Sequence, residues 1–216
     1  MKRFSLFLML VLSAFPLLAQ EFDSDAKVQE VYQACIAMRD AANANDTAAI
    51  RQSAKLLEAC DTKEFGALRS KQEQESLDGH LVFDEEFAKQ LAEGKNAYQH
   101  SDSICDTRTE RGQTVNGAIK TKTCFAKAGK SVKYTFPSKK KQILAVVAEA
   151  GGRVTMKIHV TNKKGLNKRY DDTTSVKLGL PNRKTSFMLP DDCMNVVELE
   201  VVNCSKKDIS FVVISN

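Results

Sequence analysis

Residues 141–162 read KQILAVVAEAGGRVTMKIHVTN and contain two strand patterns in succession. Residues 142–149 are apolar at almost every position, which predicts a central strand that is buried on both faces. In residues 153–161 apolar and polar side chains alternate, which predicts a strand with one buried face. Gly151 and Gly152 lie between these two strands and predict a two-residue hairpin.

The remainder of the C-terminal half continues with short strand patterns. Further strands are predicted at residues 131–136, 175–178, 185–189, 196–202 and 209–214. Residues 203–208 are expected to form the turn of a last hairpin. Short strands at this spacing, with no helical pattern among them, favour an antiparallel sandwich over a parallel sheet.

The N-terminal half has the periodicity of helices. Apolar residues recur at intervals of three and four within residues 24–44, which places them on one face of a helix. A second helix is expected to begin at Asp46 or Thr47, either of which is a favourable N-cap, and to run to Cys60. Together the two helices are expected to form a helical hairpin.

A third, shorter helix is predicted over residues 84–93. Asp84 is its expected N-cap, and Gly94 lies just past its end, where glycine commonly terminates a helix. The polar, Gln- and Glu-rich residues 62–79 are predicted to form a loop.

Charge divides the chain at the point where the pattern changes. The 216 residues carry a net charge of +5. Residues 20–111 contain 11 Lys and Arg against 19 Asp and Glu, a net charge of −8, whereas residues 112–216 contain 19 against 8, a net charge of +11. We therefore predict an α+β fold, in which an acidic N-terminal helical hairpin unit, residues 20–111, is followed by a basic antiparallel jelly-roll-like β-sandwich, residues 112–216.

Residues 1–19 have the pattern of a cleavable signal peptide. Met1-Lys2-Arg3 is a short basic start, residues 4–18 are almost wholly apolar, and Ala19 is a small residue at the expected cleavage point. The apolar run is shorter than the roughly 20 residues that span a bilayer, so an integral membrane protein is not expected. The pattern predicts a secreted or periplasmic protein whose mature chain begins near Gln20.

Six cysteines follow the predicted signal peptide. An oxidising compartment favours at least one disulfide, and the pairs with the shortest loops are Cys35–Cys60 and Cys105–Cys124. In a tight helical hairpin, however, Cys35 and Cys60 are offset by about 7.5 Å of axial rise. The alternative to this disulfide is that both are buried thiols in the helical core. Cys193 and Cys204 flank a predicted strand, which sets them too far apart to pair with each other.

The order of strands in residues 112–216 resembles that of the bacterial pre-peptidase C-terminal domain. The resemblance is carried by Tyr134-Thr135-Phe136, the apolar strand 143–147, the strand 156–160, and the final strands 197–201 and 210–213. It implies a jelly-roll-like sandwich that is appended to secreted proteins and takes part in targeting or ligand contact, not in catalysis. It implies no site residue.

Catalytic and metal-binding motifs give no strong candidate. The sequence contains no CxxC, HExxH, GxSxG or P-loop motif, and no catalytic residue or cofactor is predicted. His80 and His100 lie in polar segments at irregular distances from the cysteines, and His159 lies on the polar face of its strand. Asp171 and Asp172 are calcium candidates on a sandwich loop, although adjacent aspartates are more commonly turn formers and caps. An undetected hydrolase remains an alternative.

Basic residues are concentrated at the turns expected between strands. The candidates for ligand binding are Lys139, Lys140, Lys141, Lys163, Lys164, Lys168, Arg169, Arg183 and Lys184, and Lys206 and Lys207 follow at the last turn. One interpretation is a solvated surface that keeps the protein soluble, and the other is contact with an anionic partner. The expected compartment and the lack of interleaved aromatic residues disfavour nucleic acid, and the absence of Trp disfavours a neutral sugar.

The sequence therefore predicts a non-catalytic binding or adhesion module, whose partner is an anionic polysaccharide or the envelope surface. The alternative is a structural or protein-interaction role, in which the helical region docks a protein partner.

Overall fold

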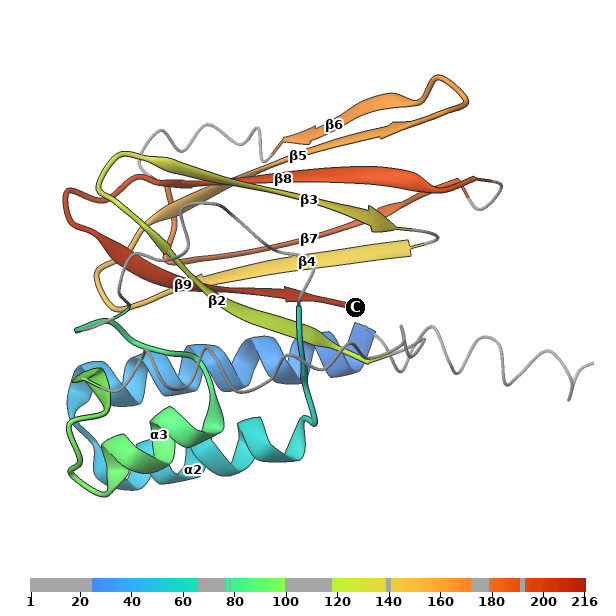
Figure 1. The fold of residues 1–216 in the computed structure, drawn as a ribbon. Coiled ribbons are helices and arrows are strands. Elements are labelled where there is room, and N and C mark those ends of the chain that lie inside the picture. The colour runs from blue at the N-terminus through green and yellow to red at the C-terminus, as the bar shows by residue number, and fades with distance from the viewer. Residues whose placement is uncertain are drawn as a thin grey trace, which may run out of the picture.

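The computed structural model describes residues 25–65, 77, 79–99, 118–138, 141–171, 179–190 and 193–216. Within them the chain forms helices that pack against two stacked sheets, as Figure 1 shows. The helices are an N-terminal helix, helical over residues 25–44, then α2 (Thr47–Ala59), α3 (Glu85–Ala92) and the 3-10 turn η1 (Ala97–Gln99). No helix in these residues is long and apolar enough to span a membrane.

The helix boundaries follow from their caps, as the sequence predicts. The Asp46 side chain accepts hydrogen bonds from the backbone N–H groups of Ala48 and Ala49, both at 3.0 Å, and so begins α2. Asp84 accepts from the N–H of Phe87 at 2.7 Å and begins α3. Two N-caps and three helical segments of the sequence analysis are therefore confirmed.

The strands form a five-stranded and a four-stranded sheet. The five-stranded sheet has the order β1-β2-β9-β4-β7 and the four-stranded sheet the order β3-β8-β5-β6. Their bounds are β1 Lys63–Glu64, β2 Lys120–Ala126, β3 Ser131–Ser138, β4 Lys141–Ala148, β5 Val154–Asn162, β6 Asn167–Asp171, β7 Asn182–Met188, β8 Asn195–Asn203 and β9 Ile209–Ser215. All of these pairs are antiparallel except β1–β2. The predicted α+β fold with an antiparallel sandwich is confirmed, and β4 is a central strand as expected.

Both predicted hairpins are wrong, because each turn crosses from one sheet to the other. Strand β4 pairs with β7 and β9, whereas β5, which follows Gly151 and Gly152, pairs with β6 and β8. Likewise, β8 and β9 belong to different sheets. At Gly152 a Cβ atom would lie 2.8 Å from the Ala148 Cβ and 2.9 Å from the Glu149 carbonyl oxygen. The glycine is therefore required by a sharp corner between two layers and not by a flat two-residue turn.

Strand β2 and two short edge strands, β1 and β6, are not among the predicted strands. Residues 63–64, within the predicted loop, form β1 and pair in parallel with Lys120 and Thr121 of β2. Residues 167–171 form β6, whose polar sequence has no apolar alternation. The predicted strand at 175–178 lies outside the described residues.

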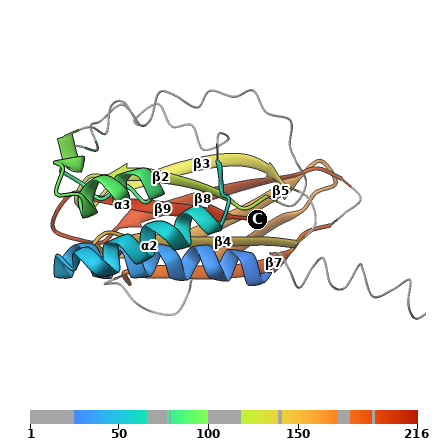
Figure 2. The same cartoon turned by 90° about the horizontal axis from the view of Figure 1, so that it is seen from below.

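Two apolar layers are separated by the five-stranded sheet. Consecutive side chains of β4 point to opposite faces, so Leu144 and Val146 lie between the sheets while Ile143, Ala145 and Val147 face the helices. Val212 and Ile214 of β9 join the layer on the helical side, where they pack in one cluster with residues of all three helices. Figure 2 shows the N-terminal helix, α2 and α3 covering this sheet. The acidic helical region and the basic sandwich thus share a hydrophobic core.

Truncation of the shared layer should destabilise both regions together. Ile214→Ala removes a fully buried side chain and should lower the free energy of unfolding by about 2 to 5 kcal/mol. In hydrogen-exchange measurements the amides of α2 and of β8 should lose protection to the same extent. The matched control, Leu56→Ala, truncates a side chain that is 45% exposed and should change stability by about 1 kcal/mol or less. Loss of protection confined to the helices would contradict a common core.

Candidate functional site

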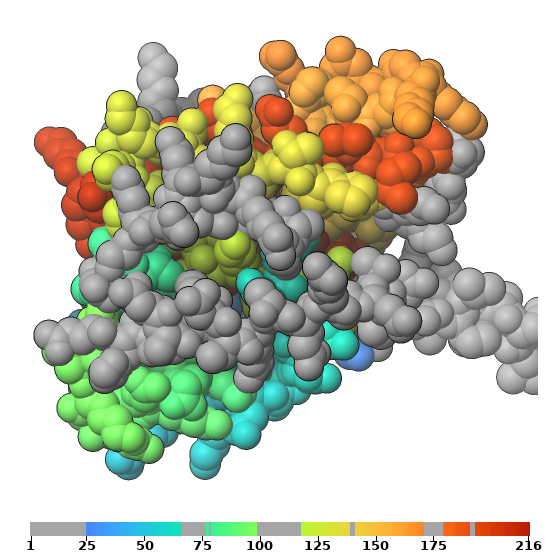
Figure 3. All heavy atoms as spheres, viewed as in Figure 1, coloured from blue at the N-terminus to red at the C-terminus, as the bar shows by residue number. Residues whose placement is uncertain are grey.

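Three turns that are far apart in the sequence meet at one end of the sandwich. They are the β2–β3 turn (residues 127–130), the β4–β5 turn (149–153) and the β8–β9 turn (204–208). Ala128 N–H donates to the Asp208 carboxylate at 2.9 Å, and Arg153 N–H donates to the Ser205 hydroxyl at 2.7 Å. The β8–β9 turn, red at the left of Figure 3, projects from the molecular surface.

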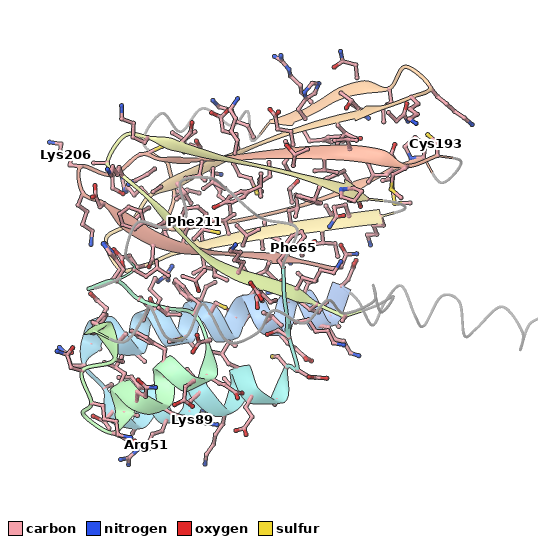
Figure 4. The ribbon with its side chains drawn as sticks, viewed as in Figure 1. Arg51, Phe65, Lys89, Cys193, Lys206 and Phe211 are labelled. Carbon is pink, nitrogen blue, oxygen red and sulfur yellow. The ribbon has the colours of Figure 1, made fainter. Side chains whose placement is uncertain are left out.

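These turns bring a group of exposed cations together, which we call the basic end. Its members are Lys127, Lys130, Arg153, Lys206 and Lys207. Figure 4 shows Lys206 at this end of the sandwich and Cys193 at the opposite end. Within the basic end an open hollow of about 490 Å³ is lined by Gly151, Arg153, Cys204, Ser205, Lys206 and Lys207. Three of the six lining residues are cationic and none is acidic, so the hollow suits an oxyanion.

Lys207 connects the hollow to a buried carboxylate. Its ammonium group donates a hydrogen bond to the Ala150 carbonyl oxygen at 2.8 Å and lies 3.8 Å from Oε1 of Glu149. Glu149 immediately follows β4, and its side chain is only 11% exposed. A carboxylate at such a position is stabilised only when donors surround it.

Donors from the segment after β1 and from β9 surround Glu149. His80 Nδ1 lies 3.0 Å from Oε1, while the Leu81 N–H donates to Oε2 at 3.2 Å and the Ser210 hydroxyl lies 3.1 Å from Oε2. Burial raises the pKa of Glu149, but these hydrogen bonds together outweigh it and hold the pKa below its ordinary value. The charged carboxylate is therefore favoured, and it ties residues 80–81 to the sandwich.

The His80, Glu149 and Ser210 side chains do not have the arrangement of a hydrolytic triad. Ser210 is fully buried, and its hydroxyl contacts the carboxylate and the Leu81 carbonyl oxygen at 2.7 Å rather than the imidazole. Nucleophilic activation requires contact between the hydroxyl and the histidine base. Sequence reasoning missed this cluster, because His80 lies in a polar segment 69 positions from Glu149.

The predicted ligand-binding residues do not form one surface. Lys139 and Lys140 lie outside the described residues, and Lys141, the first residue of β4, forms an ion pair with Asp25 of the N-terminal helix. Lys163 and Lys164 are exposed at the β5–β6 turn, as predicted. Because β5 ends where β8 begins, this turn lies at the opposite end of the sandwich from the basic end.

The other four predicted residues lie on strands and not at turns, so that placement is wrong. Lys168 and Arg169 are exposed on β6, and the Lys168 ammonium lies 4.9 Å from the centroid of the Tyr170 ring. Arg183 and Lys184 lie on β7. Strands β6 and β7 are sheet edges, where charged side chains prevent pairing with another chain. A basic edge strand therefore has a polar sequence that is easily mistaken for a turn.

Of the two β7 cations, one is buried and the other contacts the N-terminal helix. Arg183 is only 9% exposed. Lys184 faces the N-terminal helix, where it hydrogen-bonds Gln29 and lies 5.8 Å from the centroid of the Tyr32 ring. Lys184 thus attaches the N-terminal helix to β7, whereas Arg183 pairs in register with Val146, whose side chain lies between the two sheets.

The exposed face of the four-stranded sheet carries both signs of charge. Register pairs Lys133 and Lys157 with Glu200, and the Lys157 ammonium lies 3.4 Å from the Glu200 carboxylate. The Lys133 ammonium, on β3, lies 3.9 Å from the carboxylate of Glu198, which is on β8 like Glu200. Because the acidic side chains of β8 lie between the lysines of β3 and β5, this face has little net positive charge. His159 lies on the same face, as predicted, and contacts Asn167 at 2.7 Å.

The structure gives no support to a metal site within the part that it describes. Asp171 is the last residue of β6, but its side chain and the whole of Asp172 lie outside the described residues. Among the described residues, no group of three or more His, Cys, Asp or Glu side chains could hold a metal ion.

Cys35 and Cys60 are free thiols in the structure and do not form the candidate disulfide. Cys35 is fully buried among the helices, and burial raises the pKa of its thiol far above the ordinary value, with a smaller effect of Cys60. The alternative of buried thiols thus describes Cys35. Cys105 lies outside the described residues, so the Cys105–Cys124 pair stays a prediction, and Cys124 itself is buried in β2.

Comparison with known proteins identifies no family for this chain. No family model and no curated protein matches it. Solved structures with a similar arrangement include the Yersinia pseudotuberculosis-derived mitogen, 9% identical over 45% of this chain and 84% of that chain, with a TM-score of 0.34. TmCBM61 in complex with beta-1,4-galactotriose is 10% identical over 47% of this chain and 83% of that chain, with a TM-score of 0.30. A periplasmic inhibitor of g-type lysozyme from Salmonella Typhimurium is 17% identical over 51% of this chain and 93% of that chain, with a TM-score of 0.30. Because these TM-scores are all below 0.5, the similarities support no conclusion about this chain.

Removal of the Glu149 carboxylate should destabilise the fold at neutral pH. Glu149→Ala leaves the Leu81 N–H and the His80 ring without their acceptor, which should lower the free energy of unfolding by about 2 to 4 kcal/mol in urea denaturation. The matched control is Glu198→Ala, which removes a carboxylate from the exposed face and should cost about 1 kcal/mol or less. Equal effects of the two changes would contradict the structural role of Glu149.

The stabilisation by Glu149 should also depend on pH. Because the folded-state pKa is lowered, the contribution is complete above the ordinary value of about 4.3 and is lost as the pH falls through the folded-state pKa. The stability difference between wild type and Glu149→Gln should therefore be fully present above about pH 5 and shrink below about pH 4. A difference that stays constant down to pH 2 would contradict this assignment.

Proposed function

We propose that this protein is a secreted or periplasmic, non-catalytic binding protein that uses its basic end to hold an anionic polysaccharide. The observation that carries the proposal is the meeting of three turns, which places three exposed cations around an open hollow and two more on the neighbouring turn. Grouped cations attract a polyanion more strongly than dispersed ones, because each charge acts within a screening length of about 8 Å at physiological salt.

The shape of the site favours a polymer over a small molecule. Small-molecule sites are usually enclosed clefts, whereas Arg153, Lys206 and Lys207 line an open hollow and are themselves exposed. Lys127 and Lys130 extend the positive surface beyond the hollow along the neighbouring turn. A chain with repeated sulfate, phosphate or carboxylate groups can contact several of these cations at once, which adds weak contacts into useful affinity.

The compartment supports a glycan as the source of those groups. The signal-peptide pattern of residues 1–19 favours export, where acidic polysaccharides are available and nucleic acid is scarce. The chain has no Trp, the residue that most often stacks on neutral sugar rings, so charge and not stacking should supply the affinity.

The alternative role, in which the helical region docks a protein partner, has less support. The apolar residues on the inner faces of the N-terminal helix, α2 and α3 are used within the chain, where they pack on β4 and β9. The large exposed apolar side chain of α2 is Leu56, which is a single residue and not a patch.

Neutralisation of the hollow should weaken binding without harming the fold. The triple variant Arg153→Gln, Lys206→Gln, Lys207→Gln should bind dextran sulfate or polygalacturonate about tenfold more weakly at physiological salt, since three exposed contacts at about 0.5 kcal/mol each are worth about 1.5 kcal/mol. Its thermal stability should stay within about 1 kcal/mol of wild type, because these side chains are exposed. Wild-type affinity should fall steeply as salt is raised.

The matched control is the triple variant Lys163→Gln, Lys164→Gln, Lys168→Gln, which removes the same charge from exposed residues elsewhere on the sandwich. It should retain most of the affinity. An equal loss in both triple variants would show that net charge and not the basic end governs binding. Retention on phosphatidylglycerol vesicles alone, with none on either glycan, would reject the polysaccharide in favour of a lipid surface.

A further inference from the structure

We propose that protonation of His80 strengthens the binding of anions at the basic end. This inference rests on the proposed function and adds a control of the same site by pH. It follows from one carboxylate oxygen of Glu149 that lies within 4 Å of two basic side chains, His80 and Lys207.

The shared atom is Oε1 of Glu149. His80 Nδ1 lies 3.0 Å from it, in the segment between β1 and α3, and the Lys207 ammonium lies 3.8 Å from it, in the lining of the hollow. Gly151 lies beneath the lysine, and a Cβ atom at this position would be 3.4 Å from Lys207 Cε. The lysine therefore crosses the β4–β5 turn at close range and reaches both the carboxylate and the hollow.

The charge of His80 determines how strongly Lys207 can attract an anion in the hollow. When the imidazole is neutral, Lys207 is the cation that lies beside the charged Glu149, and the attraction between them reduces the potential in the hollow. When the imidazole is protonated, His80 and Glu149 form a neutral pair. Lys207, whose side chain is 55% exposed, can then turn toward an anion together with Arg153 and Lys206.

The other groups that face this pair do not provide the same response. The Leu81 N–H and the Ser210 hydroxyl contact Glu149 but do not titrate near neutrality. Tyr98 of η1 has its pKa raised, first by burial and then by Glu149, so it stays neutral there. The ring of Phe125 from β2 packs edge-on against His80, with centroids 5.1 Å apart.

The other charged groups of the basic end are of types that do not ordinarily change charge between about pH 5.5 and 8. They are the lysines and Arg153 on one side and Asp208, which accepts the Ala128 N–H, on the other. Histidine is the side chain that ordinarily changes charge between about pH 5 and 8. His159, the other histidine in the described residues, lies on the exposed face of the four-stranded sheet.

The test measures the affinity of the protein for dextran sulfate between pH 8 and 5.5 at constant ionic strength. Sulfate esters stay ionised over this range, so a change in affinity reports on the protein. Wild type should bind about fivefold more tightly at pH 5.5 than at pH 8, as one added charge near the site would give. Titration calorimetry in buffers of different ionisation enthalpy should show proton uptake on binding, because the two equilibria are linked.

Three variants assign the effect. His80→Gln should bind with the affinity of wild type at pH 8 and show neither the rise at low pH nor the proton uptake. Lys207→Gln should also lose the pH dependence. Because Lys207 lies in the β8–β9 turn, this variant tests the mechanism without altering the segment that carries His80. His159→Gln, the matched control, should keep the full rise.

The outcomes separate this inference from the proposed function. Binding that is weak at every pH in wild type would overturn both. Salt-sensitive binding with no pH dependence, or a rise in affinity that persists in His80→Gln, would leave the basic end as the binding site and overturn only its control by His80.

Discussion

Burial of the central strands on both faces is the constraint on which the architecture depends. Strands β4 and β9 have to be apolar at successive positions, because one set of side chains fills the sandwich and the other supports the helices. The helices cover that second face and are not an appendage joined by a linker (Figure 2). The same constraint explains Glu149, which stands where β4 leaves the apolar layers and where a charge needs several donors to remain.

Local structure could be predicted from the sequence, because its causes are local. Asp46 and Asp84 cap their helices through bonds to residues two or three positions away, and alternation in β5 and β8 follows from the strand itself. The choice of sheet could not be predicted in this way. A period of two shows that a strand has one buried face, but it does not say whether the next strand continues the sheet or crosses to the other. Gly152 was a signal for the crossing, but its meaning depends on the contact with Ala148.

The site shows the same limit. Lysine clusters are visible in the sequence, yet their function depends on neighbours that only the fold provides. Lys184 packs against a helix, Lys157 is balanced by Glu200, and Lys206 projects from the basic end. Three turns separated along the chain produce one positive surface, and the pair formed by His80 and Glu149 joins it to the helical region. Neither the meeting of the three turns nor the contact between His80 and Glu149 produces a motif with fixed spacing in the sequence.

The position of β9 has a consequence for the way in which the chain folds. This strand lies between β2 and β4, and both partners precede it by a long interval of sequence. The five-stranded sheet is therefore incomplete until β9 is inserted, and the helices lack the packing surface that Val212 and Ile214 supply until then. Folding in which such distant pairings come first is slow, because the entropy of closing long loops is lost before the contacts compensate for it. The apolar residues of the N-terminal helix belong to the same cluster as Val212 and Ile214, so β9 cannot cover them before it is inserted.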